Sequence, residues 1–119
     1  MSDFRHFDLE DVDRVSVLTL KHQDFFDRLV IRELQDEMTE YVKNASPAKL
    51  LINFGRASAV SSETINALLR TREWILANNG QLKLCDMTDT VRTVFKVANL
   101  EPTIFEIHDS MSKALEAFD

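Results

Sequence analysis

The stretch Lys49–Leu69, KLLINFGRASAVSSETINALL, most constrains what this chain of 119 residues can fold into. Its first half holds an apolar run that is too short for a core helix and ends at Gly55. Such a run predicts a central β-strand that is covered on both faces. The apolar residues after Ser62 recur at the spacing of one helical face. The stretch therefore predicts a buried strand and a helix, joined by a loop that places Ser61 and Ser62 where the helix begins.

The rest of the chain alternates strand-like and helix-like segments. The expected strands are Phe4–Leu9, Val15–His22, Lys49–Phe54, Gln81–Met87 and Ile104–His108. The expected helices run from a cap at Asp24 or Asp27 to near Asn44, from Ser62 to Asn79, through Val91–Ala98, and over Ser110–Phe118. Alternation of this kind implies right-handed crossovers and a largely parallel sheet. We therefore predict an α/β fold in one domain over residues 1–119, with a mixed, mostly parallel sheet of about five strands and about four helices.

Two turns are also expected from local sequence. The polar segment Glu10–Arg14 is expected to separate the first two strands as a hairpin connection. Gly80 follows the second helix and is expected to supply the left-handed conformation that is common just past a helix end.

Composition and charge exclude several classes of partner. Hydrophobic residues make up 45% of the chain and charged residues 29%, which is typical of a globular domain. The formal net charge of −6 argues against a nucleic-acid or anionic-membrane partner, since both are bound through clustered Lys and Arg. No window approaches the roughly 20 apolar residues that cross a bilayer, and Met1–Glu10 carries charges where a signal peptide would be apolar. We therefore expect a cytoplasmic protein.

The sequence offers no obvious residue set for a cofactor or a metal. His6, His22 and His108 lie on separate expected strands or strand ends and lack the spacing of metal ligands. The single Cys85 cannot form an internal disulfide and is expected to be a small buried hydrophobe. Two glycines are too few for a phosphate-binding loop or a nucleophile elbow. We expect no catalytic, cofactor or metal site.

Three aromatic residues are candidates for contact with a partner. Trp74 falls on the flank of the second helix, where it is expected either to cover the edge of the core or to anchor a partner. Phe25 and Phe26 are adjacent, so they do not easily point into one core together. We expect one of them to be exposed.

Four segments resemble the STAS domain, and together they cover almost the entire chain. They are KLLINF leading to SSETINALL, the turn ANNGQLKLCDM, the segment VRTVFKVANLEPTIFEI and the closing DSMSKALEAF. Each is similar to the corresponding STAS element in order and spacing. The STAS domain is the fold of bacterial anti-sigma-factor antagonists and of the cytoplasmic tails of sulfate transporters. The resemblance implies a non-enzymatic signalling domain that acts in transcription regulation.

The family's signature gives a candidate phosphorylation site. It is an Asp-Ser-Ser-Gly or Asp-Thr-Ser-Gly run at the start of the helix after the central strand, in which the hydroxyl residue following Asp is phosphorylated by a partner kinase. By position, Ser61 stands at the Asp, Ser62 at the phosphorylated hydroxyl, Glu63 at the next hydroxyl and Thr64 at the Gly. The resemblance therefore implies a phosphoprotein modified at Ser62, with Ser61 as the second choice.

The same resemblance implies regulation by partner switching. The unmodified domain would bind an anti-sigma factor that is itself a serine kinase, and phosphorylation would end that binding. A homodimer or a larger STAS-containing complex is a further option. The expected partner-binding residues are Arg56, Ser58, Ser61, Ser62, Glu63 and Asn66.

Two of these residues have more than one interpretation. Arg56 is expected either to steer an ATP-bound kinase or pair with a phosphoserine, or to be an ordinary solvated charge. The negative charge of Glu63 either mimics a modified state in part or favours the positive end of the helix dipole.

Two other functions remain open. In the first, Ser62 is an ordinary helix cap and the chain is a STAS-like scaffold or small-ligand-binding module that has lost phosphoregulation. The altered signature at Ser61 and Thr64 is consistent with it. In the second, Ser62 is the nucleophile of an α/β enzyme, but the sequence offers no local base and no glycine-rich oxyanion loop. A histidine within hydrogen-bond reach of Ser62 would revive that interpretation.

Overall fold

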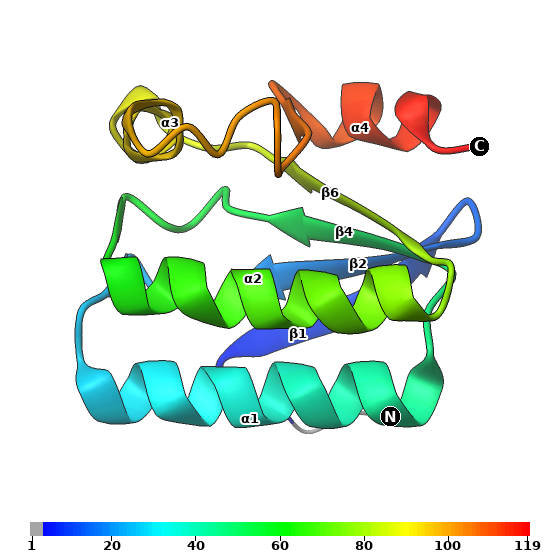
Figure 1. The fold of residues 1–119 in the computed structure, drawn as a ribbon, viewed down its shortest axis with the longest axis horizontal. Helices are drawn as coiled ribbons and strands as arrows, with labels where there is room; N and C mark the ends of the chain where they lie inside the picture. The colour runs from blue at the N-terminus through cyan, green and yellow to red at the C-terminus, as the bar shows by residue number, and fades with distance from the viewer. Residues whose placement is uncertain (1–3) are drawn as a thin grey trace.

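The computed structural model of the protein describes residues 4–119, which form a central sheet flanked by helices (Figure 1). The sheet has five strands in the order β1-β2-β4-β6-β7. Their bounds are β1 Phe7–Val12, β2 Val15–Leu20, β4 Lys49–Asn53, β6 Gln81–Cys85 and β7 Ile107–His108. Strand β1 is antiparallel to β2, whereas every other neighbouring pair is parallel. The predicted mixed, mostly parallel α/β fold is therefore confirmed.

The four predicted helices are also confirmed. They are α1 Arg28–Ala45, α2 Ser62–Ala77, α3 Asp89–Val97 and α4 Met111–Ala117. Helices α1 and α2 pack against each other on one face of the sheet and begin at the same end of the molecule (Figure 1). Helix α4 contacts β4, β6 and β7. Of the two caps expected for α1, Asp27 is the one that accepts hydrogen bonds from the helix start.

The apolar run of β4 is explained by packing on both faces of the sheet. Leu50 and Ile52 belong to the larger core, which includes buried side chains of α1 and α2. Leu51 points the other way, into a smaller cluster with Cys85 and with Ala114 of α4. Because successive strand residues face opposite sides, a strand covered on both faces is continuously apolar. Cys85 is fully buried, as predicted.

A small second sheet was not predicted. It consists of β3 (Asp24–Phe25) and β5 (Ala59–Val60), which pair in parallel. Each strand has only two residues, which is too short for any periodicity to be recognised. These strands lead into α1 and α2, so their pairing fixes the starts of the two helices beside each other.

Three local predictions need correction. The first strand is Phe7–Val12 instead of Phe4–Leu9, because the turn is made by Asp13 and Arg14, which both have positive φ angles. The last strand is limited to Ile107–His108. The left-handed residue after α2 is Asn79, with φ 60°, and Gly80 does not have a positive φ.

The role of Gly80 is steric. A Cβ atom added there would lie 3.0 Å from Cγ2 of Ile75 and 3.0 Å from the carbonyl oxygen of Pro47. Glycine is therefore required by close packing and not by its backbone angles. Among residues 4–119, no helix combines the length and apolar character that crossing a bilayer requires.

Candidate functional site at the start of α2

The loop between β4 and α2 is held by backbone contacts to distant segments. The amide of Gly55 donates to the side-chain oxygen of Asn53 at 2.7 Å, which turns the chain directly after β4. The backbone N–H and the hydroxyl of Ser58 both donate to the carbonyl of Gln23. Ser58 was predicted to contact a partner. In the structure it ties this loop to the segment before α1.

Ser61 is the residue that caps α2. Its hydroxyl oxygen accepts from the backbone N–H of Thr64 at 3.3 Å, and its own N–H donates to the carbonyl of Phe25 at 3.2 Å. The Thr64 hydroxyl also donates to Phe25 O, at 3.1 Å, and Thr64 is fully buried. The hydroxyl that stands at the signature's Gly position therefore joins α2 to β3.

Ser62 is the first residue of α2 and is exposed. Its neighbour Ser61 performs the capping, so Ser62 is not the N-cap of α2. Within residues 4–119, no hydrogen bond of the Ser62 side chain is found. Its hydroxyl is therefore presented to solvent at the positive end of a helix dipole.

Two further predicted residues line the surface beside Ser62. The carboxylate of Glu63 lies 3.6 Å from Nε of Arg28 at the start of α1, and both side chains are exposed. Asn66 lies one turn further along α2, and it lines a groove between α1 and α2 with Glu63 and Arg28. The structure thus brings Ser62, Glu63 and Asn66 together at one end of α2.

Arg56 is directed elsewhere. Its guanidinium lies 3.3 Å from the carboxylate of Asp8 on the edge strand β1, and Lys21 lies 3.5 Å from the same carboxylate. All three side chains are partly or largely exposed, so these ion pairs contribute little to stability. The structure thus gives Arg56 an ion-pair partner on β1.

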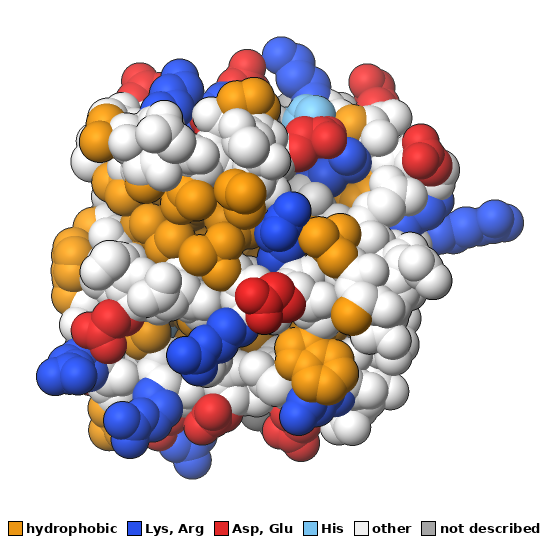
Figure 2. Space-filling model, in the orientation of Figure 1, with side chains coloured by type: hydrophobic (Ala, Val, Ile, Leu, Met, Phe, Trp, Pro, Cys, Tyr) orange, Lys and Arg blue, Asp and Glu red, His pale blue; other side chains and the backbone are white. Residues whose placement is uncertain are grey.

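Exposed apolar side chains occur just before α1 and on the surfaces of α2 and α3. Phe25 is fully buried, whereas Phe26 is 56% exposed, as predicted for one of the pair. Figure 2 shows a large apolar patch on the face that carries α2 and α3. The exposed apolar residues of these two helices are Trp74, Leu76, Val94 and Val97. Trp74 covers the helix flank, with the ammonium of Lys43 at 4.8 Å from its ring centroid.

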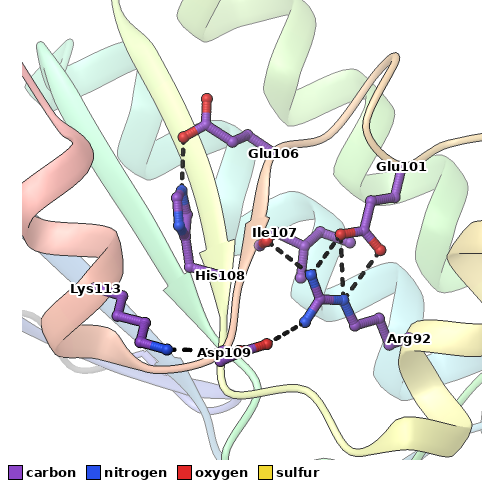
Figure 3. Close-up of polar contacts among 7 residues, drawn as sticks. All are labelled: Arg92, Glu101, Glu106, Ile107, His108, Asp109 and Lys113. Atoms are coloured by element: carbon purple, nitrogen blue, oxygen red, sulfur yellow. Dashed lines mark hydrogen bonds and ion pairs between the residues drawn. The ribbon is translucent and has the colours of Figure 1, made fainter.

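A polar cluster around α3 and β7 was missed by sequence reasoning. Arg92 of α3 binds the Glu101 carboxylate through Nε and Nη2, and it also binds Asp109 and the carbonyl of Ile107 (Figure 3). The hydrogen bond from Arg92 holds the pKa of the Asp109 carboxyl below its usual range. Because Glu101 is largely buried, this bidentate pair joins α3 to the chain that leads into β7.

A second network in the same region involves Glu106. Its carboxylate lies 2.6 Å from Nζ of Lys83 and 2.6 Å from Nε2 of His108. Burial raises the pKa of Glu106, but the bonds from Lys83 and His108 outweigh this effect and leave the pKa below its usual value. Lys83 lies 23 positions from Glu106, so no spacing in the sequence could have revealed that ion pair.

The hydrogen bonds of the three histidines are made to groups other than Ser62. His6 Nδ1 lies 2.8 Å from His22 Nε2, while His6 Nε2 lies 2.9 Å from a Glu33 oxygen on α1. His108 contacts Glu106. In the described part of the chain, no group of three His, Cys, Asp or Glu side chains is arranged to hold a metal ion.

Comparison with known proteins agrees with this architecture. Structurally similar proteins include an anti-sigma factor antagonist from Thermotoga maritima, with 19% identity, 92% of each chain covered and a TM-score of 0.80. The anti-sigma factor antagonist SpoIIAA matches in its unphosphorylated form, with 23% identity, coverage of 92% and 93% and a TM-score of 0.77. It also matches as the phosphorylated Bacillus protein, with 22% identity, coverage of 92% and 96% and a TM-score of 0.70.

Another structurally similar protein belongs to a transporter family. A sulfate transporter family protein from Wolinella succinogenes shares 14% identity, with 90% and 86% of the chains covered and a TM-score of 0.73. No curated protein matches the sequence. The family model of the STAS domain, however, matches residues 6–114, which is nearly the whole chain. With this match and the fold in agreement, the chain belongs to the STAS domain family.

Proposed function

We propose that this protein is an anti-sigma-factor antagonist that acts by partner switching and is regulated by phosphorylation of Ser62. The observation that carries the proposal is that two adjacent serines have different roles at the start of α2. Ser61 caps α2 with its side chain, whereas Ser62 is exposed on the first turn. A kinase therefore has access to a hydroxyl whose modification leaves the helix cap intact.

The helix start also suits the modified residue. A phosphate adds about −1.5 to −2 charge at neutral pH. Free N–H groups and the dipole at a helix N-terminus stabilise such a charge within the folded domain. In an interface without cations, the same charge costs desolvation and repulsion. Phosphorylation of Ser62 would then end a complex without unfolding the protein.

The exposed apolar side chains of α2 are a candidate binding surface for the partner. Residues seven apart lie two turns apart on one face of a helix, so Ser62, Leu69 and Leu76 share a stripe. Leu76 is 46% exposed, and Val94 and Val97 of α3 are exposed as well. Exposed apolar patches are typical of protein interaction sites. The stripe supports a partner, an anti-sigma factor or related serine kinase, that covers Ser62 and the apolar patch together.

The second candidate is a STAS-like scaffold or small-ligand-binding module without phosphoregulation. The observation in its favour is the altered signature: Ser61 and Thr64 replace Asp and Gly, and both are used to build the α2 start. A scaffold would retain its partners whatever the charge at Ser62.

A pull-down from native lysate separates the two candidates. The baits are the wild type, Ser62→Asp, Ser62→Ala and, as a matched control, Ser112→Asp on the first turn of α4, where the serine is also exposed. If the protein is an antagonist, the wild type, Ser62→Ala and Ser112→Asp should retain an ATP-binding kinase. Ser62→Asp should lose it. Mass spectrometry should find phosphate on Ser62 of the wild-type bait. Identical partners on all baits, with an unmodified Ser62, would establish the scaffold.

A further inference from the structure

The starts of α1 and α2 lie side by side at one end of the molecule (Figure 1). Strands β3 and β5 pair in parallel and lead directly into these helices, so both N-terminal ends lie at the same end of the molecule (Figure 1). Each first turn lies at the positive end of a helix dipole, and at α1 the carboxylate of Asp27 accepts from the N–H groups of Leu29 and Val30. A groove of about 380 Å³ lies between the two helices at this end.

Arginines dominate the charge of this groove, although the chain as a whole is acidic. Arg28, Arg32 and Arg70 line it, against the two carboxylates of Asp36 and Glu63. The whole chain, by contrast, has 14 basic and 20 acidic residues. Figure 2 shows Lys and Arg side chains, with acidic ones among them, at the end of the molecule where α1 and α2 begin. The groove is thus a local exception to the charge of the protein.

Two of the three arginines have no ion-pair partner in the fold. Arg28 lies 3.6 Å from Glu63. Over residues 4–119, by contrast, no carboxylate lies within ion-pair distance of Arg32 or Arg70. Both side chains are exposed. Guanidinium groups bind carboxylates through two parallel hydrogen bonds, so these arginines are available to carboxylates from another molecule.

We propose that the groove between α1 and α2 docks an acidic segment of the partner protein, with Arg32 and Arg70 as its cationic contacts. This inference rests on the proposed function and names the chemistry of the partner's contact. Gln35 and Asn66 also line the groove and supply amide groups for a peptide backbone. A nucleic acid is disfavoured because no aromatic side chain lines the groove for base stacking.

The groove lies next to Ser62, so modification of Ser62 would affect docking in the groove. Glu63 follows Ser62 directly, lines the groove and already binds Arg28. A phosphate on Ser62 places further negative charge beside the groove, where it repels an acidic segment and competes for Arg28. Phosphorylation would therefore weaken this contact as well as the apolar one.

The test is a fluorescence anisotropy titration of the unmodified protein with a labelled octapeptide of alternating Glu and Ala. The variants are Arg32→Glu with Arg70→Glu and, as a matched control, Arg14→Glu with Lys96→Glu, which makes the same charge change on the β1–β2 turn and on α3. At physiological salt, charges further apart than about 8 Å are largely screened, so effects of net charge are small. We expect the groove variant to bind at least about tenfold more weakly than wild type and the control to stay within about twofold.

Three outcomes would overturn the proposal. They are no saturable binding of the peptide to wild type, equal weakening in the groove variant and the control, and tighter binding of an eight-nucleotide oligothymidylate than of the peptide. The titration needs neither a kinase nor phosphorylated protein. If it fails while Ser62→Asp still loses its kinase in the pull-down, the partner switch stands and only the groove proposal falls.

Discussion

The hydroxyl of Thr64 donates a hydrogen bond to the carbonyl oxygen of Phe25 at 3.1 Å, although 39 residues separate them. The same carbonyl accepts from the backbone N–H of Ser61. One oxygen of β3 therefore receives two donors from the start of α2. The position of Ser62 depends on this joint, because Ser62 lies between the two donors in sequence.

Replacing Thr64 with Val should destabilise the fold by about 1 to 3 kcal/mol, because the change removes a buried hydrogen bond and places an apolar group beside the Ser61 hydroxyl. The free energy of unfolding from urea titrations measures the effect. Thr93→Val is the matched control, since its hydroxyl bonds to Asp89 O in an exposed setting. We expect that control to stay within about 0.5 kcal/mol. Equal losses of stability in both variants would mean that the hydrogen bond from Thr64 to Phe25 O contributes nothing to the free energy of unfolding.

The two serines should differ in their effect on stability. Ser61→Ala removes the α2 cap and should cost about 0.5 to 2 kcal/mol. Ser62→Ala removes an exposed hydroxyl outside the cap and should change the free energy of unfolding by no more than about 0.5 kcal/mol. Urea denaturation followed by circular dichroism compares the two. A larger cost for Ser62→Ala than for Ser61→Ala would contradict the assignment of the cap.

The sequence was sufficient to predict the fold because its main signals are local. The run at Leu50–Ile52 and the spacing of apolar residues in α1 and α2 follow from packing on a sheet. Apart from the short strands β3 and β5, the predicted order of strands and helices is confirmed. The signature position also located the start of α2 within one residue. These features can be predicted from the periodicity of strands and helices alone.

Long-range contacts could not be predicted in the same way. The pairing of β3 with β5 involves two residues on each side, and Arg92 reaches Asp109 across 17 positions of sequence. Neither contact leaves a periodic pattern. The choice between Ser61 and Ser62 as the cap was likewise open, because both are good capping residues and only the backbone course decides between them.

Glu106 should titrate at a lower pH than an ordinary glutamate, and Lys83→Met should raise its pKa. The Glu106 pKa is lowered in the folded state, because the hydrogen bonds from Lys83 and His108 outweigh the effect of burial. Ionised Glu106 therefore stabilises the fold above its unfolded pKa near 4.5, and this stabilisation is lost as the pH falls through the folded pKa. Lys83→Met should make the acid limb of the stability curve shallower.

Carboxyl ¹³C NMR titration measures this effect directly. Lys96→Met serves as the control, since Lys96 has no ion pair with Glu106 among residues 4–119. An unchanged Glu106 pKa in Lys83→Met would show that the 2.6 Å contact with Lys83 does not persist in solution.

Thiol labelling should distinguish the buried Cys85 from position 62. Burial raises the pKa of the Cys85 thiol, so the native wild type should resist a thiol reagent at pH 8 and react only after denaturation. A Ser62→Cys variant places a thiol on an exposed first turn of a helix, where thiolates are favoured. It should label one thiol per chain in the native state and two in denaturant. Slow labelling of that variant would contradict the exposure of position 62.

Gly80 and Asn79 should respond oppositely to substitution, although they are adjacent in the turn after α2. Gly80→Ala places a Cβ 3.0 Å from the Pro47 carbonyl and 3.1 Å from that of Ile75, and backbone atoms cannot move aside easily. Overpacking of this kind should cost about 1 to 3 kcal/mol. Asn79 has φ 60°, so Asn79→Gly should be neutral or stabilising by up to about 1 kcal/mol, because glycine adopts that conformation without strain. Urea titrations of both variants test the assignment, and the reverse order would mean that the turn needs glycine for its backbone angles.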